Sequence, residues 1–97
     1  MNIRSIEARD YSWVLALSAR NEIETGHIDE AWLEAMSHEW FAASVVEPHA
    51  YLVTFAPGAR YASPNFLWFR ERFRDFVYVD RIVVAAAARG QGLARRL

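Results

Sequence analysis

The sequence predicts an α/β (α+β) domain in which a mixed, mostly antiparallel sheet is flanked by helices. Three observations predict it. Two segments with helical spacing follow a short first strand, two strand-like segments flank a proline turn, and an apolar strand leads into a glycine-containing turn. The expected order is β-α-α-β-β-(α)-β-α, and residues 1–97 form a single domain because no linker or internal repeat divides them.

Residues 2–6 alternate and predict the first strand. Asp10 is a suitable N-cap for a helix over residues 11–20, and residues 20–28 are expected to form a loop. Asp29 can cap a second helix, whose apolar stripe recurs every four residues and is expected to pack in the core. The stripe consists of Trp32, Met36 and Trp40.

Residues 43–58 predict two strands joined by a turn at Pro48, with the second strand ending at Pro57. Ser63 followed by Pro64 predicts a helix over residues 64–74, because proline is favoured in the first helical turn. Three phenylalanines would share one face of this helix: Phe66, Phe69 and Phe73.

Residues 76–84 predict a further strand with apolar residues on both faces, and we expect it to be central and covered on both sides. Strict alternation would place two sets of side chains on opposite faces. One set is Phe76, Tyr78, Asp80, Ile82 and Val84, and the other is Val77, Val79, Arg81 and Val83.

The composition excludes several kinds of functional site. The chain contains no cysteine, which excludes disulfides and a thiolate nucleophile, and His27, His38 and His49 lack the spacing of metal ligands, so we expect no metal. No apolar run approaches the ~20 residues of a membrane helix, and the N-terminus lacks a signal-peptide core. We therefore expect a cytoplasmic protein without a membrane partner.

Charge is distributed unevenly along a chain whose net charge is −1. Acidic residues dominate residues 1–50 and arginines dominate residues 51–97, while lysine is absent. The basic half indicates either an anionic partner, since arginine suits bidentate phosphate contacts, or neutralisation of one half by the other. Nucleic acid is not expected, because the arginines are scattered among apolar residues rather than clustered.

The turn after residue 84 has the properties of an anion site. Gly90 and Gly92 let a phosphate approach backbone amides at the start of an expected helix, and Arg89 adds a charged donor. A dinucleotide-binding fingerprint would need glycine at position 95, where Arg95 stands, and a P-loop would need a lysine. The turn therefore belongs to neither class.

Residues 80–97, DRIVVAAAARGQGLARRL, resemble the acetyl-CoA-binding segment of the GNAT N-acetyltransferase superfamily. That segment typically reads aliphatic-x-Val-x-Pro-x-x-Arg-Gly-x-Gly-x-Gly/Ala. Ala86 replaces the usual proline, and residues 56–69 resemble a subgroup of predicted bacterial acetyltransferases. The matching positions are Ile82, Val84, Arg89, Gly90, Gly92 and Ala94.

The resemblance implies that acetyl-CoA is the co-substrate and that it binds along this segment. The main chain of Ile82, Val83 and Val84 would pair with the pantetheine arm as another strand would, with Val83 itself a packing residue. Arg89 and Gly90 would begin the pyrophosphate loop. The amides that hold the pyrophosphate would belong to Gln91, Gly92, Leu93 and Ala94.

The resemblance also implies transfer of acetyl to an amine, which needs a base for the amine and a proton for the departing thiolate. Asp80 is the first candidate base, with an ion pair to a neighbouring arginine as the equal alternative. Tyr78 would orient a water or line the pocket, or would be a core tyrosine. The candidate contacts to the acceptor amine, which could equally be solvated polar residues, are Glu22, Glu24, Asn65 and Tyr61.

By the same resemblance, the general acid and the strands that complete the sheet would follow residue 97. We therefore expect a partial acetyltransferase domain whose isolated chain is weak or inactive. The alternative is a non-enzymatic, truncated CoA-binding or oligomerising module of the same fold. In either case we expect self-association through an open sheet edge.

Overall fold

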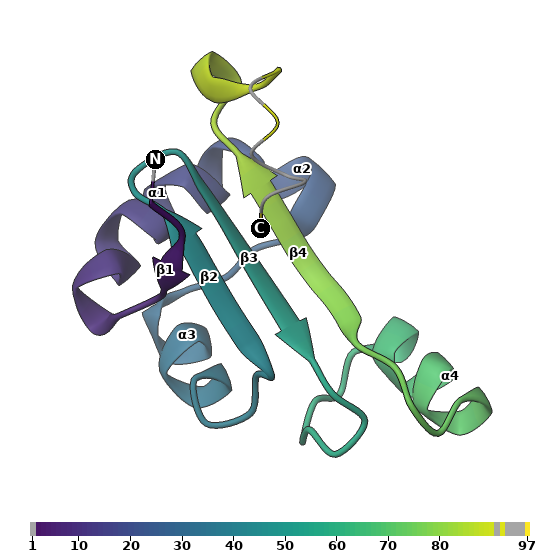
Figure 1. Cartoon of the computed structure of the whole chain (residues 1–97). Helices are drawn as coiled ribbons and strands as arrows, with labels where there is room; N and C mark the ends of the chain where they lie inside the picture. The colour runs from purple at the N-terminus through teal and green to yellow at the C-terminus, as the bar shows by residue number, and fades with distance from the viewer. Residues whose placement is uncertain (1, 91, 93–96) are drawn as a thin grey trace.

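The computed structural model describes residues 2–90, 92 and 97 of the chain and has an α+β fold (Figure 1). Its elements, in chain order, are β1 (Arg4–Ser5), the 3-10 turn η1 (Ala8–Asp10), α1 (Tyr11–Arg20), α2 (Glu22–Thr25), α3 (Glu30–Met36), β2 (Ala42–Val46), β3 (Ala50–Phe55), α4 (Pro64–Arg72), β4 (Tyr78–Val84) and the 3-10 turn η2 (Ala86–Ala88).

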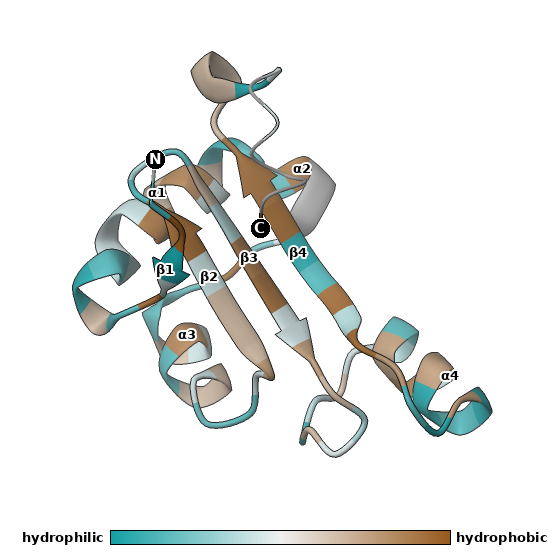
Figure 2. Ribbon diagram, viewed as in Figure 1, coloured by the Kyte–Doolittle hydropathy of each residue, from teal (hydrophilic) through white to brown (hydrophobic). Residues whose placement is uncertain are grey.

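The four strands form one antiparallel sheet in the order β1-β2-β3-β4. Figure 1 shows α1, α2 and α3 behind this sheet, with α4 beyond the end at which β4 begins. Figure 2 shows β3 and β4 as largely hydrophobic, with a hydrophilic band midway along β4. Among the described residues, none of the helices is long and apolar enough to cross a membrane.

The helix over residues 11–20 forms as predicted, but Asp10 does not cap it. The main chain at Asp10 is already helical, and its carboxylate is turned back to accept hydrogen bonds from the Glu7 amide, the Trp13 indole and the Arg4 guanidinium. Asp10 is completely buried. Its side chain therefore connects β1 to α1 instead of capping the N-terminus of the helix.

The expected loop at residues 20–28 contains the short helix α2, so that prediction was wrong for residues 22–25. Asp29 caps α3 as predicted, because its Oδ1 accepts a hydrogen bond of 2.8 Å from the Trp32 amide. Helix α3 ends at Met36, which leaves Trp40 in the following turn, yet the predicted stripe still packs against the core.

The hairpin of β2 and β3 turns at Pro48 as predicted. Helix α4 begins at Pro64 but ends at Arg72, two residues before the predicted end. Of the three phenylalanines expected on one face, Phe66 is fully buried, whereas Phe69 and Phe73 are 38% and 50% exposed. Only the first therefore anchors α4 to the core.

Strand β4 departs from strict alternation because it contains a β-bulge. Val53 pairs with Arg81 and Thr54 pairs with Val79, so Asp80 is an extra residue without a partner on β3. Arg81 therefore lies on the same face as Tyr78 and Asp80, where alternation had placed it opposite, and Ile82 projects from the other face. A bulge depends on pairing with another strand, which the pattern of a single strand does not reveal.

Strand β4 is also an edge strand in the described part of the chain, and not the central, doubly covered strand that we expected. It pairs with β3 on one side only. Val77, Val79 and Ile82 are 54%, 51% and 38% exposed. The inner strands are β2 and β3, and the residues of β3 are almost all buried.

The main core lies between the sheet and helices α1 and α3, with Phe66 of α4 at one end. A second, smaller cluster contains Ala88 of η2 and packs against Val46 and Ala50, with Leu97 beside it. The buried side chains of the main core are Val14, Leu17, Ile28, Leu33, Ala43, Val45, Tyr51, Val53, Phe55, Ala59, Phe66 and Val83.

Candidate functional site

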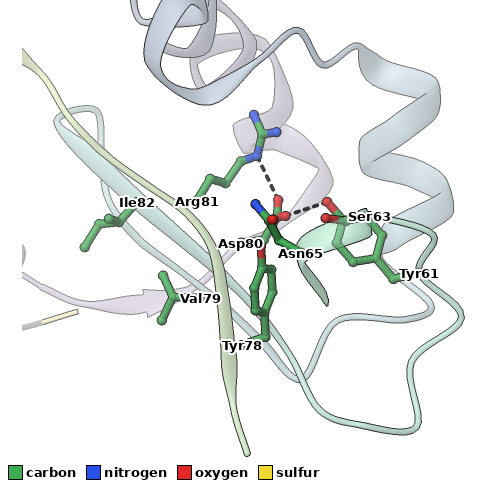
Figure 3. A pocket seen from close by; sticks show the side chains of 8 residues that line it. All are labelled: Tyr61, Ser63, Asn65, Tyr78, Val79, Asp80, Arg81 and Ile82. Atoms are coloured by element: carbon green, nitrogen blue, oxygen red, sulfur yellow. Dashed lines mark hydrogen bonds and ion pairs between the residues drawn. The ribbon is translucent and has the colours of Figure 1, made fainter. Parts of the chain in front are cut away.

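The β4 bulge opens into a cleft of about 570 Å³, here called the Asp80 cleft. It lies where β4 meets the loop that precedes α4. It joins five of the residues that the sequence singled out, namely Tyr61, Asn65, Tyr78, Asp80 and Ile82. Its lining consists of Tyr61, Ser63, Asn65, Tyr78, Val79, Asp80, Arg81 and Ile82 (Figure 3).

Asp80 is held by two partners in this cleft. The Tyr61 hydroxyl donates to its Oδ1 at 2.5 Å, and the Arg81 Nε donates to its Oδ2 at 3.1 Å. The Asp80 and Arg81 side chains are each 7% exposed. The ion pair that was the alternative role for Asp80 is thus present, and both carboxylate oxygens already accept a hydrogen bond (Figure 3).

Arg81 is fixed from several directions. Its guanidinium lies over the Trp32 ring, 4.9 Å from the ring centroid, and reaches the Gly26 carbonyl oxygen at 3.5 Å. Tyr61 in turn stacks on Phe55, with ring centroids 4.2 Å apart. These contacts join the Asp80 cleft to the core, so its polar groups have little freedom to move apart.

Tyr61 remains a neutral hydrogen-bond donor at ordinary pH. Burial is the main cause that raises the pKa of its phenol, and the hydrogen bond to the Asp80 carboxylate raises the pKa further. Burial favours the uncharged phenol, and a tyrosinate would face a carboxylate at 2.5 Å. The proton therefore stays on Tyr61.

The outer edge of β4 presents main-chain groups next to this cleft. The Ala85 amide donates to the His49 carbonyl, so the next pair, Ala50 and Val84, is not mutually hydrogen-bonded. The N–H and C=O groups of Val84, and of Ile82 two residues earlier, consequently face away from β3. Val83 faces the other way, with its main chain toward β3 and its side chain buried.

Arg89 closes the far end of β4. Its Nε donates to the outward Val84 carbonyl at 3.1 Å, and one terminal nitrogen donates to Asn21 Oδ1 at 2.9 Å. A second cleft of about 410 Å³, here called the Arg89 cleft, lies at this junction. Its lining consists of Leu17, Arg20, Asn21, Ala85, Ala86, Ala87 and Arg89.

Two glycines of the predicted pyrophosphate loop have left-handed backbone conformations. Gly90 and Gly92 have φ of 88° and 74°, a region that other residues rarely adopt. An added Cβ would meet no atom within 4 Å at either position, so only the backbone conformation demands glycine. The predicted contacts Gln91, Leu93 and Ala94 lie outside the described residues, as does most of the helix expected there.

The predicted substrate contacts are separated in the fold. Glu22 belongs to α2 and is exposed, with its Oε2 3.6 Å from His27 Nδ1, and it lines neither cleft. Glu24 lies in the same short helix. Asn65 lines the Asp80 cleft from the first turn of α4 and lies beside Asp80.

Sequence reasoning named Tyr61 only as a candidate contact to the acceptor, because it lies in an irregular segment where no periodicity indicates which way a side chain points. The Arg81 ion pair was expected as the alternative role of Asp80. The residues that sequence reasoning missed are Arg20 and Asn21, which line the Arg89 cleft. They stand at the end of α1, whose distance from residue 89 depends on the tertiary fold.

In the part of the chain that the structure describes, no group of three or more histidine, aspartate or glutamate residues is arranged to hold a metal ion. Comparisons of the chain with protein-family models, with curated proteins and with solved structures find no match.

Proposed function

We propose that this chain is the acetyl-CoA-binding part of an N-acetyltransferase, which transfers an acetyl group from the CoA thioester to an amine. The observation that carries the proposal is the outward main chain of Ile82 and Val84, at a strand edge with which no other strand pairs among the described residues. It stands directly before Arg89 and two left-handed glycines. An extended pantetheine arm, with amides of its own, can pair with such an edge.

The antiparallel strand order supports the proposal, because the resemblance implies a strand, helices and then an antiparallel series before the CoA loop. The short helix α2 is an addition to the expected order. With pantetheine along Ile82, the thioester would lie beside the Asp80 cleft, which Ile82 also lines. The acceptor amine would enter through that cleft.

In the proposed reaction the amine nitrogen attacks the thioester carbonyl carbon, a C–N bond forms and the C–S bond breaks. The amine loses a proton and the CoA thiolate gains one. Asp80 is the candidate base, and it would accept the proton only after an oxygen is released by Tyr61 or Arg81. Tyr78 lines the cleft beside it.

The test is calorimetric titration of the chain with acetyl-CoA, using Arg89→Glu and Arg74→Glu as variants with the same change in charge. Arg74 is exposed near the start of β4, whereas Arg89 follows its end. We expect saturable binding that Arg89→Glu abolishes and Arg74→Glu preserves. Absence of binding, or equal binding by both variants, would contradict the proposal.

Turnover is measured separately. The chain contains no cysteine, so a thiol reagent reports only the CoA that is released. We expect slow release or none, because both oxygens of the candidate base Asp80 already accept hydrogen bonds. Fast turnover that survives Arg89→Glu would contradict the assignment of this edge as the CoA site.

A further inference from the structure

The Arg89 cleft combines two guanidinium groups with small neighbours. Arg20 is the last residue of α1, and Arg89 follows η2, so the fold brings together side chains that are far apart in the sequence. Three alanines line the cleft beside them and leave room for a ligand. No carboxylate belongs to the lining formed by the described residues.

The charge of Arg89 is held in place without being neutralised. Both of its hydrogen-bond acceptors are neutral oxygens, the Val84 carbonyl and the Asn21 side-chain amide. Other arginines differ in this respect, since Arg4 and Arg81 are paired with carboxylates at 2.7 Å and 3.1 Å. A guanidinium oriented by neutral groups keeps its full attraction for an anion.

Arg20 contributes a second uncompensated charge. Its side chain is exposed, and within the described residues it has neither an ion pair nor a hydrogen bond to another side chain. Glu22, two residues later, is near His27 instead. The cleft therefore carries two positive charges and no opposing acid among the residues that the structure places there.

We propose that the Arg89 cleft binds a phosphate monoester and that Arg20 is a direct contact to it. Two guanidiniums suit a doubly charged phosphate, because each can donate two parallel hydrogen bonds to its oxygens. The phosphate is separate from the pyrophosphate assigned to residues 91–94. It is either the 3′-phosphate of CoA, which rests on the proposed function, or a phosphate on another small molecule.

The experiment compares the wild-type chain with Arg20→Ala and with Arg74→Ala as a matched control. Each is titrated calorimetrically with acetyl-CoA and with its 3′-dephospho analogue, and inorganic phosphate is titrated by NMR at the amides of Leu17, Asn21 and Ala86. For acetyl-CoA we expect Arg20→Ala to weaken binding about tenfold, and we expect no effect on the dephospho analogue. Phosphate should shift the three amides in the wild type and less in Arg20→Ala.

The outcomes separate this inference from the proposed function. One outcome is that phosphate shifts the cleft amides in an Arg20-dependent way but acetyl-CoA does not bind. The Arg89 cleft is then a phosphate site for another small molecule, and the acetyltransferase proposal is overturned. If acetyl-CoA binds equally to wild type and Arg20→Ala and phosphate shifts no cleft amide, the inference is overturned and the proposed function stands. If neither ligand binds the wild-type chain, both are overturned.

Discussion

The hydroxyl of Tyr61 donates a 2.5 Å hydrogen bond to Oδ1 of Asp80, and this contact joins an irregular loop to the bulge of β4. The second oxygen of Asp80 is held by Arg81. Because Arg81 is 8% exposed, its charge depends on this carboxylate for compensation. The three side chains form one hydrogen-bonded cluster. Removal of Asp80 would leave the Arg81 charge unpaired, whereas removal of the Tyr61 hydroxyl would remove one hydrogen bond.

We expect Asp80→Asn to cost about 3 kcal/mol of unfolding free energy, because it leaves the buried Arg81 charge without a counterion. Tyr61→Phe should cost less, about 2 kcal/mol, since it removes one hydrogen bond to a charged group. Urea denaturation followed by circular dichroism measures both. Equal costs for the two variants would show that the Arg81 charge does not depend on Asp80.

Tyr61 is expected to titrate above the ordinary pKa of a tyrosine. Its pKa is raised above the ordinary value of 10.0, so its contribution to stability is complete below that pH and is lost as the pH rises through the higher pKa. Ultraviolet absorbance of tyrosinate follows the titration. Tyr61→Phe should remove a step that lies above pH 10.0, and removal of a step near that pH instead would contradict the burial of this phenol.

Asp10 is expected to control stability in acid. Hydrogen bonds from Arg4, and also from Trp13 and the Glu7 amide, lower its pKa from the ordinary value of 3.8 even though burial acts in the opposite direction. Its contribution is therefore present above that pH and is lost as the pH falls toward the depressed pKa. Asp10→Asn should cost about 3 kcal/mol at neutral pH and flatten the acid dependence of stability.

The measurement for Asp10 is the unfolding free energy from urea denaturation at a series of pH values. Asp75→Asn is the matched control, because Asp75 is exposed and makes no hydrogen bond or ion pair within the described residues. The control should behave as wild type. If both variants changed the acid dependence equally, general charge effects rather than the buried Asp10 cluster would be responsible.

The outer edge of β4, which pairs with no other strand among the described residues, is expected to pair with a second copy of the chain. Val79 is 51% exposed on this strand, and a lysine on an edge strand opposes pairing. Val79→Lys should therefore reduce self-association in sedimentation experiments over a range of protein concentrations. Phe41→Lys, at a residue 63% exposed just before β2, is the control and should leave association unchanged. A wild-type chain that stays monomeric throughout would contradict the expectation.

Local patterns were sufficient for most of the elements. The apolar spacing of residues 11–20, the Asp29 cap and the proline turn at Pro48 act over a few neighbouring residues, and each formed as expected. Apolar periodicity also placed Trp32 and Met36 against the core. Such features depend on hydrogen bonds and side-chain contacts within one helix or hairpin, so the sequence alone determined them.

Tertiary structure decided what the local patterns could not. The bulge at Asp80 depends on the register of β4 against β3, and it reversed the expected faces of Arg81 and Ile82. Pairing also decided that β4 is an edge strand in the described chain. Only the folded chain brings Tyr61 to Asp80 in one cleft and Arg20 to the side of Arg89 in the other. The sequence by itself determined most of the helices and strands and which residues carry charge. Long-range pairing decided which of those charged residues meet, because contacts between distant segments leave no periodic signal in either segment.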